Sequence, residues 1–297
     1  MTIEVAVPAT IANLGPGFDA LGMAVDLYDR FRVAIADRAA VVFSGESAGE
    51  ISRIPTPLVA RAAEAVTRRA GRDAVFAIDA RLAIPVARGL GSSAASIVGG
   101  LVAANHLLGN PLDRSTLLEM AAELEGHPDN VAAALLGGVV VVTADGGVRA
   151  GRFLPRLDLD IILTIPDLAI ATEEARALLP RTVSLSDAVF NLSRAALLVT
   201  ALLTGDAALL PAALNDRLHQ PHRARLLPGF ANVVAAAREA GAYGAVLAGS
   251  GSTVAALSPP GQSERVGEAM RQAFARHNVK AAVRTVHVDP HGATVRA

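Results

Sequence analysis

The feature that most constrains this chain is a loop at residues 85–95, which reads Pro-Val-Ala-Arg-Gly-Leu-Gly-Ser-Ser-Ala-Ala. It stands between a short apolar run and a long apolar segment with the composition of a helix. Backbone N–H groups in such a loop, placed at a helix N-terminus, can bind phosphate. The only lysine in the chain is Lys280, so this is not a Gly-x-x-x-x-Gly-Lys-Ser/Thr loop. The phosphate charge would have to be stabilised by backbone amides, the helix dipole, a metal ion and arginine.

Two other interpretations of the same residues stay open. The loop can be a plain glycine turn into a helix that Ser92 caps. Residues 89–94 also fit the Gly-x-Gly-x-x-Gly/Ala pattern of dinucleotide-binding oxidoreductases. That pattern needs a strand directly before the loop and another strand after the helix. Here Pro85 and Arg88 interrupt the segment that leads into the glycines. The dinucleotide interpretation therefore ranks last.

The composition excludes several classes of protein. The chain has 297 residues, 52% of them hydrophobic and 19% charged, which predicts a compact fold of one large or two ordinary domains. The formal net charge of −1 argues against nucleic acid as the main partner. The chain has no cysteine, so disulfides and thiolate chemistry are excluded, and any metal would take oxygen or imidazole ligands.

No targeting or membrane segment is expected. No basic region precedes an apolar stretch at the N-terminus, where Glu4 interrupts the sequence. The two long uncharged runs, residues 89–112 and 242–263, contain polar residues, glycines or prolines, and we expect both to be buried inside the fold. The chain is accordingly expected in the cytoplasm, without a membrane partner.

Strand and helix patterns mix along the chain without strict alternation, which favours an α+β fold over a doubly wound sheet. We expect strands near residues 2–7, 23–35, 41, 75–84, 139–143, 148–153, 159–165 and 283–288, and helices near 58–70, 92–108, 113–125, 173–179, 186–203, 228–240 and 264–277. Residues 8–17 are expected to form a loop, and the last strand to close the fold. A domain boundary is placed near residue 155.

Residues 125–130, Glu-Gly-His-Pro-Asp-Asn, pack carboxylates, an imidazole and an amide into one short segment. Glu125 could hold Mg²⁺ together with a loop serine, because magnesium takes few protein carboxylates plus phosphate oxygens. The alternative is a solvated Gly-Pro turn in which Asp129 is the helix N-cap.

Further polar residues could bind a small ligand. Asp19 suits an ammonium group and Asn13 a neutral or charged one, although this segment can also be a simple turn. Arg176 and Arg223 could each bind a carboxylate in a bidentate way, or lie on the surface. Residues 244–252 can support a neighbouring phosphate loop by close backbone packing, or form a tight hairpin.

Taken in order, these segments resemble the GHMP small-molecule kinase superfamily, and within it the homoserine kinases. The resemblance rests on Val-Pro-Ala-Thr-Ile-Ala-Asn-Leu-Gly-Pro-Gly-Phe-Asp at residues 7–19, on residues 88–95 and on Glu-Gly-His-Pro-Asp-Asn at 125–130. Residues 219–229 and 244–252 match later segments of the family. The resemblance covers nearly the full length of the chain.

The resemblance implies a two-domain GHMP kinase fold. Residues 1–155 would form a half similar to the second domain of ribosomal protein S5, and residues 156–297 a ferredoxin-like half, with the active site between them. It also implies a cytoplasmic, homodimeric transferase of threonine biosynthesis. That enzyme would use ATP and Mg²⁺ to phosphorylate the hydroxyl of L-homoserine, giving O-phospho-L-homoserine.

The resemblance also implies roles for individual residues. Those that bind the phosphates of ATP would be Pro85, Arg88, Gly89, Leu90, Gly91, Ser92, Ser93 and Ala94. Ser93 and Glu125 would hold Mg²⁺ and, with Asn130, form the catalytic set. Those that bind homoserine would be Asn13, Asp19, Asp129, Arg176 and Arg223. Relatives carry asparagine near residues 54–58, where the adenine is held, whereas this chain has Pro57.

Two alternatives to homoserine phosphorylation remain. The chain could be a GHMP kinase of another small alcohol, such as a mevalonate or diphosphocytidyl-methylerythritol relative, but an isoprenoid precursor needs no ammonium partner like Asp19. It could also be a silent relative that binds ligand without transferring phosphate, against which Ser93 and Glu125 argue.

Overall fold

The computed structural model describes residues 1–51 and 57–296. Its larger sheet has the strand order β11-β1-β2-β4-β3, with β5 paired to β2 and β6 paired to β5. The strands are β1 (Thr2–Ala12), β2 (Leu21–Ile35), β3 (Ala40–Gly45), β4 (Phe76–Leu82), β5 (Val139–Thr143), β6 (Arg149–Phe153) and β11 (Thr294–Arg296). Neighbouring strands are antiparallel except β3 and β4, which are parallel.

The first strand is longer than expected, and the prediction of a loop from residue 8 is wrong for residues 8–12. The register between β1 and β2 shifts between Pro8 and Ala9, which marks a bulge. A bulge tolerates proline because one residue of the strand there need not donate a ladder hydrogen bond. Pairing then resumes through Ala12, which brings Asn13 to the end of a rigid strand.

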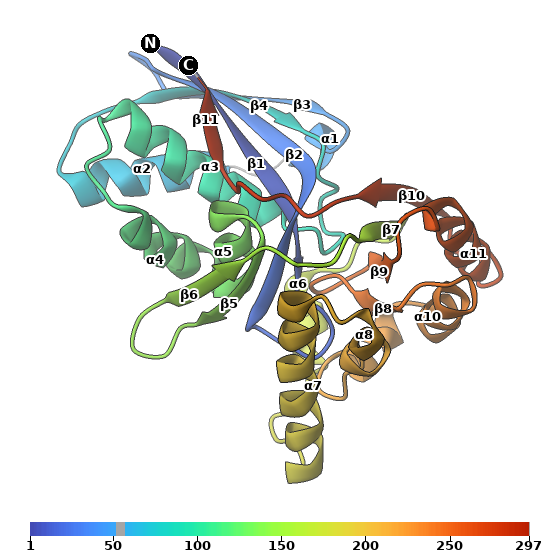
Figure 1. Ribbon diagram of the computed structural model, residues 1–297. Helices are drawn as coiled ribbons and strands as arrows, with labels where there is room; N and C mark the ends of the chain where they lie inside the picture. Colours follow the sequence, from blue (N-terminus) through green and yellow to red (C-terminus); the bar gives the residue numbers. More distant parts are fainter. Residues whose placement is uncertain (52–56, 297) are drawn as a thin grey trace.

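Helices cover one face of the larger sheet (Figure 1). They are α2 (Leu58–Ala70), α3 (Ser92–Leu107), α4 (Arg114–Glu125) and α5 (Pro128–Leu136), and the short α1 (Ala48–Ile51) follows β3. The expected ends of two of them are confirmed, since Gly71 closes α2 in the left-handed conformation and Asp113 caps α4 by accepting from Thr116 N.

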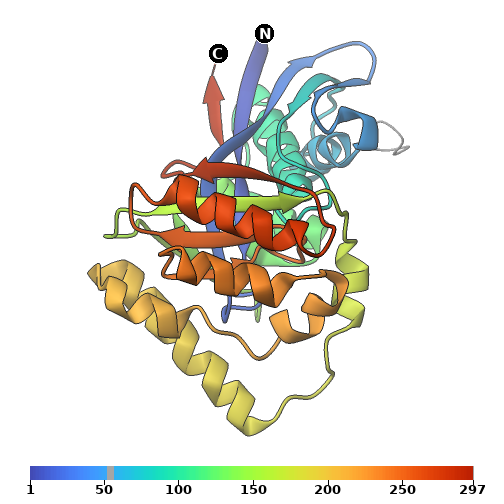
Figure 2. The same cartoon turned by 90° about the vertical axis from the view of Figure 1, so that its right-hand side faces the viewer.

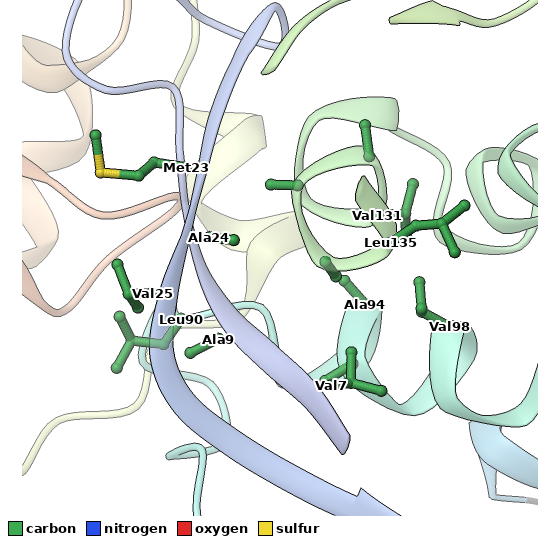
Figure 3. Packing of buried hydrophobic residues seen from close by; sticks show 14 of the residues in the cluster. Val7, Ala9, Met23, Ala24, Val25, Leu90, Ala94, Val98, Val131 and Leu135 are labelled. Carbon is green, nitrogen blue, oxygen red and sulfur yellow. The ribbon is translucent and has the colours of Figure 1, made fainter. Parts of the chain in front are cut away.

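The core of the larger sheet forms around α3, which is buried on almost every side. Gly99 and Gly100 allow close approach, because a Cβ there would overlap the Phe31 ring and the Val59 carbonyl oxygen. Figure 3 shows part of this core, in which side chains of β1 and β2 pack with those of α3 and α5. The labelled residues are Val7, Ala9, Met23, Ala24, Val25, Leu90, Ala94, Val98, Val131 and Leu135.

The second sheet has the order β10-β7-β9-β8 and is antiparallel throughout. Its strands are β7 (Asp160–Pro166), β8 (Gly244–Leu247), β9 (Val254–Ser258) and β10 (Ala281–Val286). Numbered along the chain this is the order 4-1-3-2, with α10 (Phe230–Glu239) before β8 and α11 (Ser263–Ala275) before β10, both on one face (Figure 2). That arrangement is ferredoxin-like, and the predicted α+β class is confirmed.

The remaining helices lie between β7 and α10. They are α6 (Thr172–Ala177), α7 (Leu185–Thr204), α8 (Leu210–Ala213) and α9 (Gln220–Arg223), with single 3₁₀ turns at Ala207–Leu209 and Ala224–Leu226. Figures 1 and 2 show α7 extending away from both sheets. By length and composition α7 is the one helix in the described part of the chain that could span a membrane, with a mean hydropathy of 1.3 and 22% of that window buried. Length and composition alone are weak evidence for such a span.

The last strand departs from the sequence-based expectation. The strand expected to close the fold, near residues 283–288, is β10 of the second sheet, and a further strand, β11, follows it. β11 pairs with β1 in the larger sheet, from Glu4 opposite Arg296 to Ala6 opposite Thr294. The two ends of the chain consequently lie side by side (Figure 1).

Candidate active site

A cavity of about 300 Å³ brings together segments that are far apart in the sequence. Its lining includes every residue that was predicted to be catalytic or to bind substrate: Asn13, Asp19, Ser93, Glu125, Asp129, Asn130, Arg176 and Arg223. From the glycine–serine loop (residues 85–94), the cavity is lined by Pro85, Val86, Ala87, Gly89, Leu90, Gly91, Ser92 and Ser93.

Two residues of that loop lie elsewhere. The Arg88 guanidinium donates to the Pro166 carbonyl oxygen at 3.0 Å and lies 3.5 Å from the Asp167 carboxylate, and Arg88 lines a second, open hollow beside β7. Ala94 is fully buried in the core. The arginine of the loop therefore fastens it to the second sheet.

The glycine–serine loop enters α3 without a side-chain cap. Gly91 is the N-cap in the left-handed conformation, and no acidic residue stands in the first turn. The interpretation that Ser92 caps the helix is therefore wrong, and the buried Ser92 hydroxyl has no hydrogen-bond partner. Uncapped N–H groups and the positive end of the helix dipole make this terminus suited to an anion.

The turn between β8 and β9 supports the loop from behind. A Cβ on Gly89 would overlap the Ala248 carbonyl oxygen, so only glycine allows this approach of two backbones. Thr253 N also donates to the Arg88 carbonyl oxygen at 3.1 Å. Both open interpretations of residues 244–252 thus hold, since β8 and β9 form a hairpin and its turn packs against the loop.

Ser93 and Glu125 both line the cavity and bond to each other. The Ser93 hydroxyl donates to Glu125 Oε1 at 2.6 Å. Burial raises the pKa of the Glu125 carboxyl above its usual value, although the bond from Ser93 opposes this shift. Among residues 1–51 and 57–296 no cluster of three or more His, Cys, Asp or Glu side chains could hold a metal. A hydroxyl and one carboxylate fit Mg²⁺, which completes its shell with phosphate oxygens and water.

Asp129 and Asn130 lie in the first turn of α5. His127 is the N-cap of this helix, so the interpretation of Asp129 as the cap is wrong. Asp129 Oδ1 accepts from the backbone N of Asn130 at 2.9 Å, and Asn130 Oδ1 accepts from the Thr10 hydroxyl at 2.7 Å. Both side chains are thus held by neighbouring donors at the wall of the cavity.

Asp19 and Arg176 form a bidentate ion pair across the cavity. Arg176 donates to the two carboxylate oxygens of Asp19 at 3.0 and 2.7 Å, and these bonds raise the pKa of Arg176. Asn13 Oδ1 accepts from the backbone N of Asp19 at 3.0 Å, which fixes the turn. Each side chain is about one third exposed, so the pair can be reached from the cavity.

Arg223 is a buried cation in the floor of the same cavity. It donates to the Gly249 carbonyl oxygen at 2.9 Å, while its Nε has no partner. Burial, together with the charge of Arg176, lowers the pKa of Arg223 to about 10, so it stays protonated at neutral pH. The guanidinium groups of Arg176 and Arg223 lie 5.5 and 5.2 Å from the ring of Phe18, which brings two cations to one site.

Comparison with known proteins agrees with this geometry. Residues 57–138 match the GHMP kinases N terminal domain, and residues 198–276 match the GHMP kinases C terminal domain. A homoserine kinase of Moorella thermoacetica is 47% identical, covering 98% of this chain and 99% of the relative, and one of Thermosynechococcus vestitus is 44% identical over 99% of both. The crystal structure of homoserine kinase from Cytophaga hutchinsonii, 33% identical, superposes with a TM-score of 0.91 and covers 99% of this chain and 97% of its own.

The chain belongs to the homoserine kinase branch of the GHMP kinases. Residues from both halves of the chain line one cavity. The mevalonate kinase fold is related, with a TM-score of 0.70 at 14% identity, which shows a common fold only.

Sequence reasoning missed several residues of this GHMP kinase site. Thr172 and Glu173 at the start of α6 and Ser250 in the β8–β9 turn line the cavity. Ser250 lies within the segment 244–252 that the sequence singled out, but none of these three side chains was given a role. His127 could have been suspected from its place in Glu-Gly-His-Pro-Asp-Asn, since it lies 3.3 Å from Asp129 and 4.0 Å from Glu125. Burial lowers the pKa of His127, but these two carboxylates outweigh it and the net shift is upward.

The expected adenine segment is only partly described. Ile54, Pro55 and Thr56 lie outside the described residues, whereas Pro57 and Leu58 line the cavity beside Phe43 and Val59. This part of the lining is apolar, and it lies in the N-terminal half.

Asp29 fixes the chain just before the glycine–serine loop. Its Oδ1 accepts from the backbone N of Ala83 and Ile84 at 2.8 and 2.9 Å, while the buried Oδ2 has no partner. Ser47 Oγ donates to the Ile84 carbonyl oxygen at 3.2 Å. Burial raises the pKa of Asp29 to about 6, and the two backbone bonds only partly oppose this.

We predict that the ionisation of Asp29 destabilises the folded chain. The folded-state pKa lies above the usual value, so the stability that protonated Asp29 provides is present below about pH 4 and lost as the pH rises through 6. Asp29→Asn removes this titration. The unfolding free energy of the variant minus that of the parent should therefore rise by about 2 kcal/mol between pH 4 and pH 7. Urea denaturation at both pH values measures it, and parallel pH dependence of the two proteins would contradict the assignment.

Proposed function

We propose that this chain transfers the γ-phosphoryl group of ATP to the side-chain hydroxyl of L-homoserine, giving O-phospho-L-homoserine for threonine biosynthesis. One observation supports this most strongly. A single cavity is lined by an uncapped helix terminus suited to phosphate and by a carboxylate and two guanidinium groups suited to a zwitterion. Membership in the homoserine kinase branch of the GHMP kinases supports the same reaction.

The glycine–serine loop would bind the nucleotide. Gly89, Leu90, Gly91, Ser92 and Ser93 would surround the β- and γ-phosphates through backbone N–H groups, and the unpartnered Ser92 hydroxyl would find an acceptor there. Pro85, Arg88 and Ala94 would shape and fasten the loop. Ser93 and Glu125 would hold Mg²⁺, which when bound neutralises charge on the phosphates.

Five residues would bind the amino acid. Arg176 and Arg223 would bind its carboxylate, and Asp19, Asn13 and Asp129 its ammonium and hydroxyl ends. A zwitterion can replace the Asp19–Arg176 pair without loss of charge partners, because it brings a cation for Asp19 and an anion for Arg176. A ligand with one charge would leave one member of the pair unmatched, which costs binding energy.

Phosphoryl transfer would rely on positioning, because Asn130, which lies close to the N-cap Gly91, ends in an amide. In the proposed step the substrate hydroxyl oxygen bonds to the γ-phosphorus, the bond from that phosphorus to ADP breaks, and the hydroxyl proton passes to a transferred phosphoryl oxygen. Asn130 cannot take the proton, so it would orient the hydroxyl for in-line attack.

A panel of alcohols tests the proposed function. The panel holds L-homoserine, mevalonate, 4-aminobutan-1-ol and 4-hydroxybutanoate, each with ATP, with and without Mg²⁺, and ADP release is measured. We expect turnover of L-homoserine only, lost when Mg²⁺ is chelated. Preferred turnover of mevalonate would favour a kinase of another alcohol, and ligand binding without any turnover would indicate a silent relative.

Asn130→Ala should lower kcat for homoserine by about 100-fold or more, because it removes an interaction made in the transition state. Binding of ATP should change little, since the loop and Glu125 are left intact. Steady-state kinetics and calorimetric titration with a non-hydrolysable ATP analogue measure the two effects. A turnover close to that of the parent chain would show that the assigned role is wrong.

The exposed face of α7 supports a homodimer. Leu185, Val189, Leu192, Ala196, Val199 and Leu203 follow each other at steps of four and three residues, and most of them are exposed. The opposite face packs inward through Asn191, Leu198, Ala201 and Leu202. Such spacing is the seam by which two helices pack together, and a two-fold axis would pair α7 with itself.

We expect Leu192→Glu to convert the dimer to a monomer in light scattering coupled to gel filtration, because it places a charge in the seam. Ser186→Glu adds the same charge on the flank of the helix and should leave the dimer intact. A monomeric parent chain would rule out the interface.

The domain division and the location of the enzyme remain part of the proposal. Residues 1–155 would form the nucleotide domain and residues 156–297 the second domain. β11 belongs to the second range by sequence but pairs with β1 in the sheet of the first. The enzyme would act in the cytoplasm, with neither nucleic acid nor membrane as partner.

A further inference from the structure

Thr10 contacts both the glycine–serine loop and Asn130, although no role was assigned to it from the sequence. It lies on β1 and is fully buried. Its backbone N donates to the Leu90 carbonyl oxygen at 3.0 Å, within the glycine–serine loop. Its hydroxyl donates to Asn130 Oδ1 at 2.7 Å, at the start of α5. One residue of a rigid strand therefore contacts both the loop and the amide.

The hydroxyl of Thr10 determines which end of the Asn130 amide faces the cavity. With Oδ1 engaged by Thr10, the two N–H donors of Nδ2 have no partner among the described residues, and Asn130 lines the cavity. An amide nitrogen donates hydrogen bonds and an amide oxygen only accepts them. A flipped amide would present its oxygen to the anionic phosphates, which is unfavourable.

We infer that Thr10 is a positioning residue for phosphoryl transfer, holding Asn130 so that its amide nitrogen donates to the substrate hydroxyl oxygen or to the transferred phosphoryl group. This inference rests on the proposed function. A donor on one lone pair of the hydroxyl oxygen leaves the other lone pair free to attack phosphorus. The hydroxyl proton then has a phosphoryl oxygen as its acceptor, and Asn130 needs no change of protonation.

Gly91 shows that the position of the Thr10 hydroxyl is constrained from the loop as well. A Cβ on Gly91 would overlap Thr10 Oγ1 and would lie 3.2 Å from Asn130 Oδ1. The Thr10 hydroxyl thus lies against the N-cap Gly91 on one side and bonds the Asn130 amide oxygen on the other.

Paired variants of Thr10 test this role. Thr10→Ser keeps the hydroxyl, Thr10→Ala differs from it only by the loss of that hydroxyl, and Thr10→Val keeps the shape of threonine. We expect kcat for homoserine to fall about 10- to 100-fold in the alanine and valine variants, with KM for ATP within about twofold. The serine variant should stay within about threefold of the parent, since it can still hold the amide. Thermal unfolding identifies any variant that has lost its fold.

The double variant Thr10→Val with Asn130→Ala separates positioning from general damage. If Thr10 acts through Asn130, the double variant turns over as fast as Asn130→Ala alone, because the effects are not additive. Losses that multiply, a serine variant as impaired as the alanine variant, or a valine variant with the kcat of the parent would each overturn the inference.

The proposed function is tested by the parent chain alone, and its failure can be distinguished from failure of the role of Thr10. If the parent chain turns over another alcohol of the panel, the proposed function is wrong and the same variants are assayed on that alcohol. If the parent chain turns over none of them, both the function and the role of Thr10 are overturned.

Discussion

The site depends on the approach of two backbones at Gly89 and the β8–β9 turn. Gly249 lies at the centre of this contact, since its N donates to Ala12 and its carbonyl oxygen accepts from both Asn13 and Arg223. One residue therefore contacts the end of β1, the loop before α3 and the short helix α9. A Cβ on Gly89 would overlap the Ala248 carbonyl oxygen, and a Cβ on Gly249 would lie only 3.0 Å from the Gly89 carbonyl oxygen, so the two halves of the chain meet here through glycines.

Most charged side chains of the cavity lie next to a side chain of opposite charge or to a histidine. Asp19 faces Arg176, and His127 stands between Glu125 and Asp129. Arg223 bonds to the Gly249 carbonyl oxygen and to the His219 ring, and burial lowers its pKa to about 10 although the charges of Asp19, Asp129 and Asp216 oppose this. His219 lies buried beside it and bonds the Gly15 carbonyl oxygen, and burial lowers the pKa of this histidine. A neutral His219 leaves the positive charge on the arginines, where an anionic group of a ligand can use it.

Much of the fold and most of the site could be predicted from the sequence because the signals are local. Gly71 ends α2 by its left-handed conformation, and Asp113 begins α4 by capping it. The segment at residues 125–130 indicates a polar site because carboxylates, an imidazole and an amide stand close together in the sequence. The extension of β1 past Pro8 could not be predicted, since it depends on pairing with β2. The bidentate bond between Asp19 and Arg176 joins residues 157 positions apart, and only the packing of α6 against the N-terminal turn creates it.

The pairing of β11 with β1 couples the first residues of the chain to the last. Until residues 294–296 have left the ribosome, one edge of β1 presents unpaired N–H and C=O groups along Glu4 to Ala6. A nascent chain with such an edge is open to pairing with other chains. Synthesis of β11 is thus the event that covers this edge, and the order of translation makes it the last edge of β1 to be protected.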